Sequence, residues 1–180
     1  MFTLALTLNA AFFSAMVWSS YRHFQRVGRE PVGASLLSTA TVCGTGLNAW
    51  LALSLPTANT MALMIAVVLS ATALTVFFAA IRETRAAAFS LAFSDTTPGA
   101  VVSSGVYGIV RHPFYAAYIL YWSSWVALTG FHPAAGVFCI AMIVAYVFAA
   151  RKEEALLSVR LGDDYTDLIA RTWRFLPGVH

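Results

Sequence analysis

Charged residues are the class that this sequence has least of. Only 11% of its 180 residues are Asp, Glu, Lys or Arg, and 59% are hydrophobic. Because a soluble globular domain carries about 25% charged residues, this chain cannot cover a water-facing surface. The composition therefore predicts an integral membrane protein, folded as one domain over residues 1–180, with the lipid bilayer as part of its solvent.

Cysteine is also scarce, and its placement excludes a metal site built on it. Cys43 and Cys139 lie within apolar runs, and neither has a Cys or His neighbour at metal-binding spacing. We interpret both as small buried hydrophobic residues and expect no metal. The basic residues lie at the edges of apolar runs rather than along one exposed helix or arm, so we expect no nucleic acid partner.

Five apolar stretches approach the length of about 20 residues that a membrane-spanning helix needs. They cover residues 3–21, 34–55, 61–81, 113–130 and 134–150. Because residues 1–21 carry no basic residue ahead of the apolar run, we expect a retained first span rather than a cleaved signal peptide. The last two stretches are short, and Gly130 to Pro133 between them predicts a tight helical hairpin with Pro133 in the first turn of the returning helix.

The C-terminal part of the chain predicts further helix. Charged and aliphatic residues alternate over 151–161 and indicate an amphipathic helix that leaves the fifth span, with Gly162 as its stop. A second short helix is expected from Asp163 to Thr172. The fold class that follows is an all-α membrane protein with five transmembrane helices and a C-terminal amphipathic helix.

The distribution of charge predicts the orientation of these spans. The turns at 56–60 and 130–133 carry no Lys or Arg, whereas the other loops and the C-terminal tail carry all of them. The positive-inside rule therefore places the N-terminus outside and the C-terminus in the cytoplasm. Two cytoplasmic pieces, 82–112 and 151–180, are long enough to hold a site, so we expect an active site that faces the cytoplasm.

One motif in the second span is misleading. Gly44-Thr45-Gly46-Leu47-Asn48-Ala49 satisfies the dinucleotide fingerprint G-x-G-x-x-G/A, but that fingerprint has meaning only between a strand and a helix. Small residues within a membrane span more commonly allow close helix packing, and this is our interpretation.

The mouth of the fourth span carries the first candidate site. Pro113 suits a first helical turn, so Arg111 and His112 lie just before a helix N-terminus, where anionic groups are favoured. Tyr115 and Tyr118 are three residues apart and hence share one helix face. A simpler interpretation remains open, in which the Arg reaches lipid headgroups and the Tyr residues join the interfacial aromatic belt.

The second candidate site is the pair Glu153-Glu154, directly after the fifth span. Two adjacent carboxylates at a membrane edge cost free energy unless they pair with bases or serve a functional site. Adjacent helix positions point about 100° apart, so one side chain can face a ligand while the other pairs with a base. A solvated charge cluster is the alternative. Similarly, Arg171, Trp173 and Arg174 in the tail indicate either an interfacial anchor or contact with the acidic end of a substrate.

Taken in order, these motifs resemble the isoprenylcysteine carboxyl methyltransferase family, which is related to the phospholipid methyltransferases. The matching segments are Ser104-Gly105-Val106-Tyr107, Arg111-His112-Pro113-Phe114-Tyr115, Glu153-Glu154, Leu161-Gly162-Asp163-Asp164-Tyr165 and Arg174-Phe175-Leu176-Pro177. The resemblance covers about residues 95–178, while the first three spans are similar only in topology. It implies a membrane enzyme that binds S-adenosylmethionine on the cytoplasmic side, within residues 95–178.

The resemblance also implies roles for single residues. The expected cofactor contacts are Gly99, Ala100, Val101, Val102 and Tyr107 in the loop, His112, Pro113, Phe114 and Tyr115 at the fourth span, and the acidic ligand Glu153. The methyl acceptor is expected to be lipophilic and to enter from the membrane, as an isoprenylcysteine carboxylate, a related lipid or a thiol. Such a carboxylate or thiolate needs no general base, whereas for an amine or a hydroxyl the candidate bases are His112, Glu154 and Tyr115.

The sequence departs from the family pattern in the substrate region. Ala149 stands where many members have Arg, so Arg151 or Arg171 is expected to bind the substrate, together with Tyr118. Ala117 and Leu168 also differ from the usual residues. We assign catalytic roles to His112, Glu154 and Arg151. Two other functions remain open. One is an NADPH-dependent sterol or enone reductase, although the chain offers few basic residues to bind the 2′-phosphate of NADPH. The other is a non-catalytic membrane subunit, although such a subunit would not need the paired motifs.

The predicted orientation is testable by cysteine labelling from either side of the membrane. Single cysteines at Thr57 and His132, in a background without the two native thiols, are expected to react with an impermeant reagent only from the outer face, because both turns lack basic residues. A cysteine at Lys152 serves as the control and should react only from the cytoplasm. Labelling of either turn from the cytoplasm alone contradicts the five-span topology.

Overall fold

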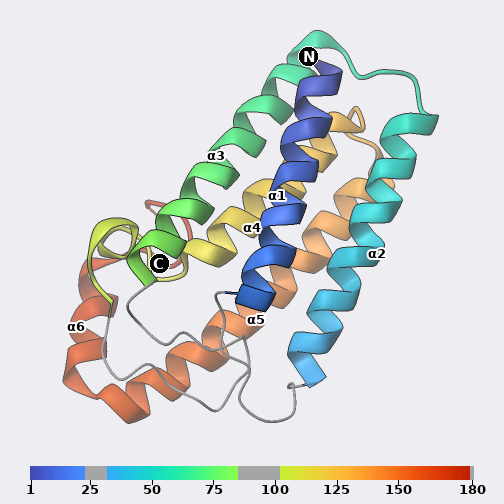
Figure 1. The fold of residues 1–180 in the computed structure, drawn as a ribbon. Helices are drawn as coiled ribbons and strands as arrows, with labels where there is room; N and C mark the ends of the chain where they lie inside the picture. Colours follow the sequence, from blue (N-terminus) through green and yellow to red (C-terminus); the bar gives the residue numbers. More distant parts are fainter. Residues whose placement is uncertain (23–31, 85–101, 179–180) are drawn as a thin grey trace.

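The computed structural model describes residues 1–22, 32–84 and 102–178. Within these ranges every regular element is a helix, as Figure 1 shows, so the expected all-α fold is confirmed for this part of the chain. The elements are α1 (Phe2–Arg22), α2 (Val32–Ser54), α3 (Thr60–Thr84), the short 3₁₀ helix η1 (Gly105–Gly108), α4 (Pro113–Leu128), α5 (Pro133–Leu161) and α6 (Asp163–Arg171).

Four of the described helices are long and apolar enough to cross a membrane: α1, α2, α3 and α5. They indicate an integral membrane protein. The helix α4 has 16 residues and is therefore roughly 24 Å long, shorter than the bilayer core of about 30 Å. The crossing of the membrane by α4, and hence the count of five spans, and the orientation of the bundle stay predictions.

The short helix α4 is the centre of the bundle. It packs against α3, α1 and α5, and Figure 1 shows it behind α1, between α3 and α5. Tyr121, Trp122 and Trp125 on α4 are almost completely buried, and the ring of Phe12 on α1 stacks on Tyr121 at 4.8 Å. A helix surrounded on all sides needs no amphipathic stripe, and α4 is accordingly apolar around its whole circumference.

A buried polar junction joins α1, α3 and α4. The Asn9 side chain donates to Ser70 Oγ at 3.1 Å and accepts from Ser124 Oγ at 2.6 Å, and all three residues are fully buried. Unpaired polar groups in an apolar interior are costly, so this exchange of hydrogen bonds fixes the relative positions of the three helices.

The helix α2 contacts the bundle through a narrow stripe. At Gly44, an added Cβ would lie 2.1 Å from the ring of Phe138 on α5, whereas at Gly46 it would meet nothing within 4 Å. The packing interpretation of this glycine pair therefore holds for Gly44 only. Cys139 is buried as expected, but the interpretation of Cys43 as buried is wrong, because Cys43 lies outside the contact stripe and is exposed.

The predicted hairpin between the last two spans is present. Gly130 and Phe131 adopt positive φ angles of 68° and 63°, and Pro133 starts α5. The helix α5 then continues for 29 residues, so the predicted 134–150 span and the amphipathic segment 151–161 form one unbroken helix. It ends at Gly162, which has a φ of 55°, and α6 follows directly.

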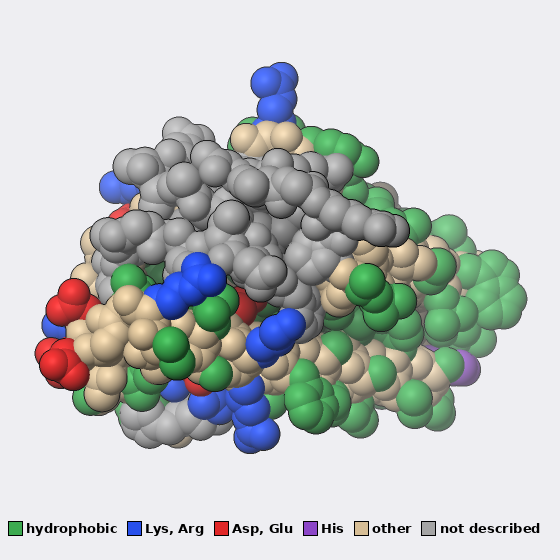
Figure 2. Space-filling view, turned by 90° about the horizontal axis from the view of Figure 1, so that it is seen from below, with side chains coloured by type: hydrophobic (Ala, Val, Ile, Leu, Met, Phe, Trp, Pro, Cys, Tyr) green, Lys and Arg blue, Asp and Glu red, His purple; other side chains and the backbone are tan. Residues whose placement is uncertain are grey.

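This geometry brings several segments to one end of the bundle. The start of α4, the end of α5, the helix α6 and the C-terminal tail lie near one another at the lower end of the view in Figure 1. Viewed from that end, Lys, Arg, Asp and Glu side chains gather over part of the face, beside the apolar flanks of the helices (Figure 2). The two sequence motifs that precede α4 and follow the apolar part of α5 meet here.

Candidate functional site

The C-terminal tail lies along the segment that precedes α4. The Arg111 amide donates to the Trp173 carbonyl at 2.8 Å, the His112 amide to the Arg174 carbonyl at 3.1 Å, and the Trp173 amide to the Ile109 carbonyl at 3.0 Å. Together they form a short parallel bridge between Val110 and Trp173. The residue before a proline is restricted to extended conformations, so Pro113 keeps His112 available for this pairing.

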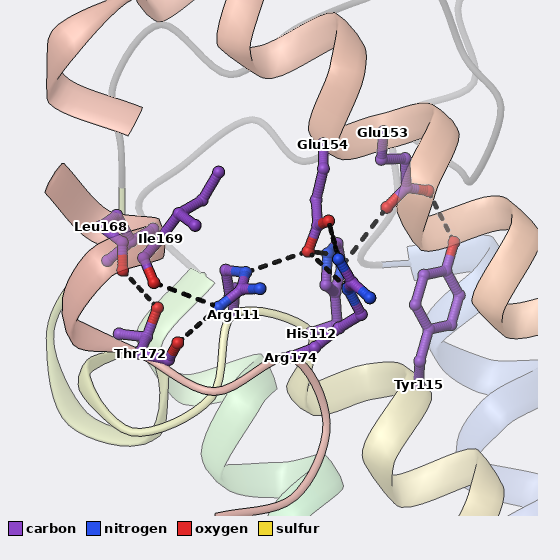
Figure 3. A network of polar contacts seen from close by, with 9 residues as sticks. All are labelled: Arg111, His112, Tyr115, Glu153, Glu154, Leu168, Ile169, Thr172 and Arg174. Carbon is purple, nitrogen blue, oxygen red and sulfur yellow. Dashed lines mark hydrogen bonds and ion pairs between the residues drawn. The ribbon is translucent and has the colours of Figure 1, made fainter. Parts of the chain in front are cut away.

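One carboxylate lies at the centre of the site, that of Glu154. Its Oε1 accepts from Arg111 Nε at 2.9 Å and lies 3.2 Å from His112 Nε2, and its Oε2 accepts from Arg174 Nη2 at 2.8 Å (Figure 3). Glu154 is 8% exposed, and Arg111 and His112 are equally buried. This carboxylate thus joins α5 to the start of α4 and to the tail.

These contacts determine the ionisation of Glu154, which lies beyond the apolar stretch of α5 that ends at Ala150. Burial alone would raise the pKa of Glu154, but hydrogen bonds from His112, Arg174 and Arg111 outweigh it and hold that pKa well below its ordinary value. The same hydrogen bonds raise the pKa of Arg174. A carboxylate that stays ionised with both oxygens occupied is a weak proton acceptor at neutral pH, so the geometry favours a structural use of Glu154 over a role as general base.

The guanidinium of Arg111 also closes the end of α6. Its Nη1 donates to the Thr172 carbonyl and lies 3.5 Å from the Ile169 carbonyl, while the Thr172 hydroxyl donates to the Leu168 carbonyl. The last carbonyls of a helix have no intrahelical partner, and a basic side chain satisfies them well. Arg111 therefore holds α6 and the start of α4 in one rigid unit.

The neighbouring carboxylate, Glu153, has a different environment. Its Oε1 accepts from the Tyr115 hydroxyl at 2.6 Å, and its Oε2 lies 3.7 Å from His112 Nδ1. The Glu153 side chain is 29% exposed, compared with 10% for that of Glu154. The two adjacent acids thus differ as their separation on the helix predicts: Glu154 pairs with bases, and Glu153 remains partly accessible.

Aromatic rings line the side of the site near Glu153. His112 stacks with Tyr115 at 5.6 Å, Tyr115 stacks with Tyr146 at 5.4 Å, and Tyr118 lies 5.5 Å from Tyr146. Ring faces beside a carboxylate form an environment that attracts cations, including onium groups.

Tyr107, in η1, belongs to the same buried cluster as Tyr115 and Tyr146. It is 5% exposed, and burial raises its pKa, with smaller contributions from Tyr118 and Glu153. Its hydroxyl therefore stays protonated and can donate a hydrogen bond.

The structure brings together fewer than half of the residues singled out from the sequence. His112, Tyr115, Tyr118 and Glu153 surround one region, Glu154 supports it, and Tyr107 lies in the same buried cluster as Tyr115. The remaining expected residues lie elsewhere: Pro113 starts α4, the ring of Phe114 packs against Phe77 at 5.5 Å in the helical core, and Val102 is half-buried against the core. Arg151 and Arg171 are exposed and take no part in the network of Figure 3. Gly99, Ala100 and Val101 lie outside the described residues.

Sequence reasoning did not identify the partners of several residues of the site. The sequence predicts Arg111 beside an anionic ligand or lipid headgroup, and Arg174 as an interfacial anchor or a contact to the acidic end of a substrate, whereas the structure pairs both with Glu154. Thr172 is fully buried and accepts from Arg111 through its carbonyl. Arg-His precedes a proline that starts a helix, and Glu-Glu follows the next span. This pattern predicts that the acids and bases form one cluster, but only the fold shows which acid pairs with which base.

Comparisons with known proteins do not extend this description. No protein-family model matches the sequence, and a search of curated proteins found no match. The chemistry of the site is therefore argued from its own residues.

The unequal environments of the two acids predict unequal effects on stability. Glu154→Gln leaves the buried guanidinium of Arg111 and the partly buried one of Arg174 without a carboxylate partner. It should reduce the free energy of unfolding by about 2–3 kcal/mol. Glu153→Gln, the matched control, should have less than about a third of that effect because its side chain is partly exposed. Thermal unfolding in detergent measures both variants.

The pH dependence provides a second measurement on the same variants. Because the folded-state pKa of Glu154 is depressed, its contribution is fully present above its ordinary pKa of 4.5 and is lost as the pH falls below that value. The difference in stability between the parent protein and Glu154→Gln should therefore shrink below about pH 4.5. Equal destabilisation by the two Gln variants, or a difference that grows on acidification, contradicts this assignment.

Proposed function

We propose that this protein is an integral membrane methyltransferase that transfers a methyl group from S-adenosylmethionine to a lipophilic acceptor. One observation carries the proposal: of two adjacent carboxylates, Glu154 is fully engaged by arginine and histidine, while Glu153 stays partly exposed beside aromatic rings. The partial exposure of the Glu153 side chain lets a ligand reach it, and the pairing of Glu154 builds a rigid support behind it. The ordered motifs shared with the isoprenylcysteine carboxyl methyltransferase family favour the same cofactor.

The residues present fit the chemical groups of S-adenosylmethionine. The cofactor carries a sulfonium and an ammonium, both cationic, together with ribose hydroxyls and an adenine ring. The Glu153 carboxylate suits the cationic groups or the ribose hydroxyls, and the ring faces of Tyr115 and His112 suit a cation or a flat base. When bound, S-adenosylmethionine supplies an activated methyl group for an in-line displacement.

The contribution of the protein to such a reaction is positioning. Tyr115 is held by its hydrogen bond to Glu153, and His112 is held between the two carboxylates. Pre-organised side chains of this kind avoid the entropy cost of orienting the reacting groups, and exclusion of water strengthens their electrostatic effect. A carboxylate or thiolate acceptor needs no general base. For an amine or hydroxyl acceptor, His112 is better suited than Glu154, whose oxygens are both occupied.

We further propose that α4, the fourth of five spans, also crosses the membrane, that the N-terminus lies outside, and that the site faces the cytoplasm. The buried, apolar character of α4 supports its place within the membrane despite its length, because its neighbours cover it from lipid. The acceptor enters from the bilayer, with an isoprenylcysteine carboxylate as the preferred class. Arg151 and Arg171 are exposed, and their charge suits the acidic end of that acceptor.

The proposal predicts that His112→Ala and Glu153→Gln each reduce methyl transfer at least tenfold, about 1.4 kcal/mol of transition-state stabilisation. Glu153→Gln keeps the shape of the side chain and removes its charge, so its loss should appear largely as weaker cofactor binding. The measurement is transfer of a labelled methyl group by purified protein to a panel of carboxylate, thiol and amine lipids. Asp164→Asn, on the exposed side of α6, is the matched control and should keep the parental rate.

Two outcomes go against this assignment. If His112→Ala and Glu153→Gln both fold, bind the cofactor normally and transfer methyl groups at the parental rate, then the two motifs are structural. If the parent protein transfers no methyl group but reduces an enone lipid with NADPH, then it is a reductase.

A further inference from the structure

A third acidic residue contacts the site from the N-terminal half of the chain. Glu83 lies in the last turn of α3, and its Oε2 accepts a hydrogen bond from the Ser104 hydroxyl at 2.5 Å. A hydrogen bond from a hydroxyl to an ionised carboxylate is short and about twice as strong as one between neutral groups. This contact links α3 to the segment that leads into η1.

Gly105 shows how closely the two segments approach each other. A Cβ added at this position would lie 2.5 Å from Cδ of Glu83 and 2.6 Å from its Oε1, distances that real Cβ atoms do not adopt. Gly105 also has a φ of 54°, in the left-handed region that side chains disfavour. The backbone conformation thus favours glycine, and any other residue would also displace the Glu83 carboxylate. The glycine of the Ser104-to-Tyr107 motif therefore lets the carboxylate pack against the turn.

The contact with Glu83 fixes the position of Tyr107. The Tyr107 amide donates to the Ser104 carbonyl at 3.0 Å, so the residue held by Glu83 also caps the turn that carries Tyr107. The Val110 amide donates to the Val106 carbonyl at 3.0 Å and continues the same turn toward Arg111. Two hydrogen bonds, from the Ser104 hydroxyl to Glu83 and from the Tyr107 amide to the Ser104 carbonyl, thus connect Glu83 to the turn that carries the buried ring of Tyr107.

We propose that Glu83 is a positioning residue that fixes the turn carrying Tyr107, an expected cofactor contact, and thereby sets the affinity for the cofactor. This inference rests on the proposed function, since it assigns Glu83 to the same site. Glu83 acts through the Ser104–Tyr107 turn, which its carboxylate contacts at the Ser104 hydroxyl. The first three helices then contribute to the site through this carboxylate and are more than a membrane anchor.

The test combines hydrogen exchange with cofactor affinity in Glu83→Ala. Without ligand, the amides of Tyr107 and Val110 should exchange at least about tenfold faster than in the parent protein, while those in the middle of α4 stay unchanged. The dissociation constant for S-adenosylmethionine should rise at least about fivefold, with kcat at saturating cofactor within about twofold of the parental value. Asp164→Asn serves as the control for loss of an acidic charge and should change neither quantity.

Ser104→Ala removes the hydrogen bond from its other end and keeps the carboxylate. It should shift exchange and affinity in the same direction by a smaller amount, and it carries the test if Glu83→Ala does not fold. Unchanged exchange at Tyr107 in the variant that folds overturns the proposal, as does faster exchange throughout α4 with a parallel loss of kcat. If the parent protein binds no S-adenosylmethionine, the proposed function fails, whereas the exchange of Tyr107 still tests the contact with Glu83.

Discussion

The carboxylate of Glu154 is the group on which the arrangement of this site depends. It is the common acceptor for the side chains of Arg111, His112 and Arg174, which come from the start of α4 and from the C-terminal tail. Removing such charges from water is costly, and the cost is offset only when the geometry is good and each charge is paired. Because the three bases converge on one acid, the end of α5, the start of α4 and the tail cannot move independently.

This rigid support gives the neighbouring residue its importance. Glu153 is the next residue on the same helix, so its direction is fixed by the pairing of Glu154, and its hydrogen bond to Tyr115 fixes the side chain itself. The two acids differ in partners and in exposure, although they are identical in type and adjacent in sequence. Glu83 extends this arrangement to α3, so acids from two separate helices determine the position of the aromatic residues around the site.

The sequence predicts those features of the fold that depend on local signals. Proline at 113 and 133 marks the starts of α4 and α5, Gly162 marks the end of α5, and long apolar runs mark the helices that can cross a membrane. It also indicates which motifs meet, since a hairpin of two helices returns the chain to the same end of the bundle.

The features that could not be predicted depend on contacts between distant segments. The pairing of Glu154 with Arg111 and Arg174 joins α5 to two segments that are distant in sequence. The exposure of Cys43 depends on which stripe of α2 faces Phe138. Likewise, the packing of Glu83 against Gly105 joins residues from separate helical segments, and no periodicity in either segment encodes it.

The most direct test of the central claim, that Glu153 and its aromatic neighbours bind S-adenosylmethionine, is ligand-dependent thermal unfolding of the parent protein in detergent. A ligand that binds only the folded state at a concentration of 100 times its dissociation constant stabilises that state by about 2.7 kcal/mol. Our account predicts stabilisation by S-adenosylmethionine and by its demethylated product, with no stabilisation by NADPH. Stabilisation by NADPH alone, or by none of the three, would contradict it.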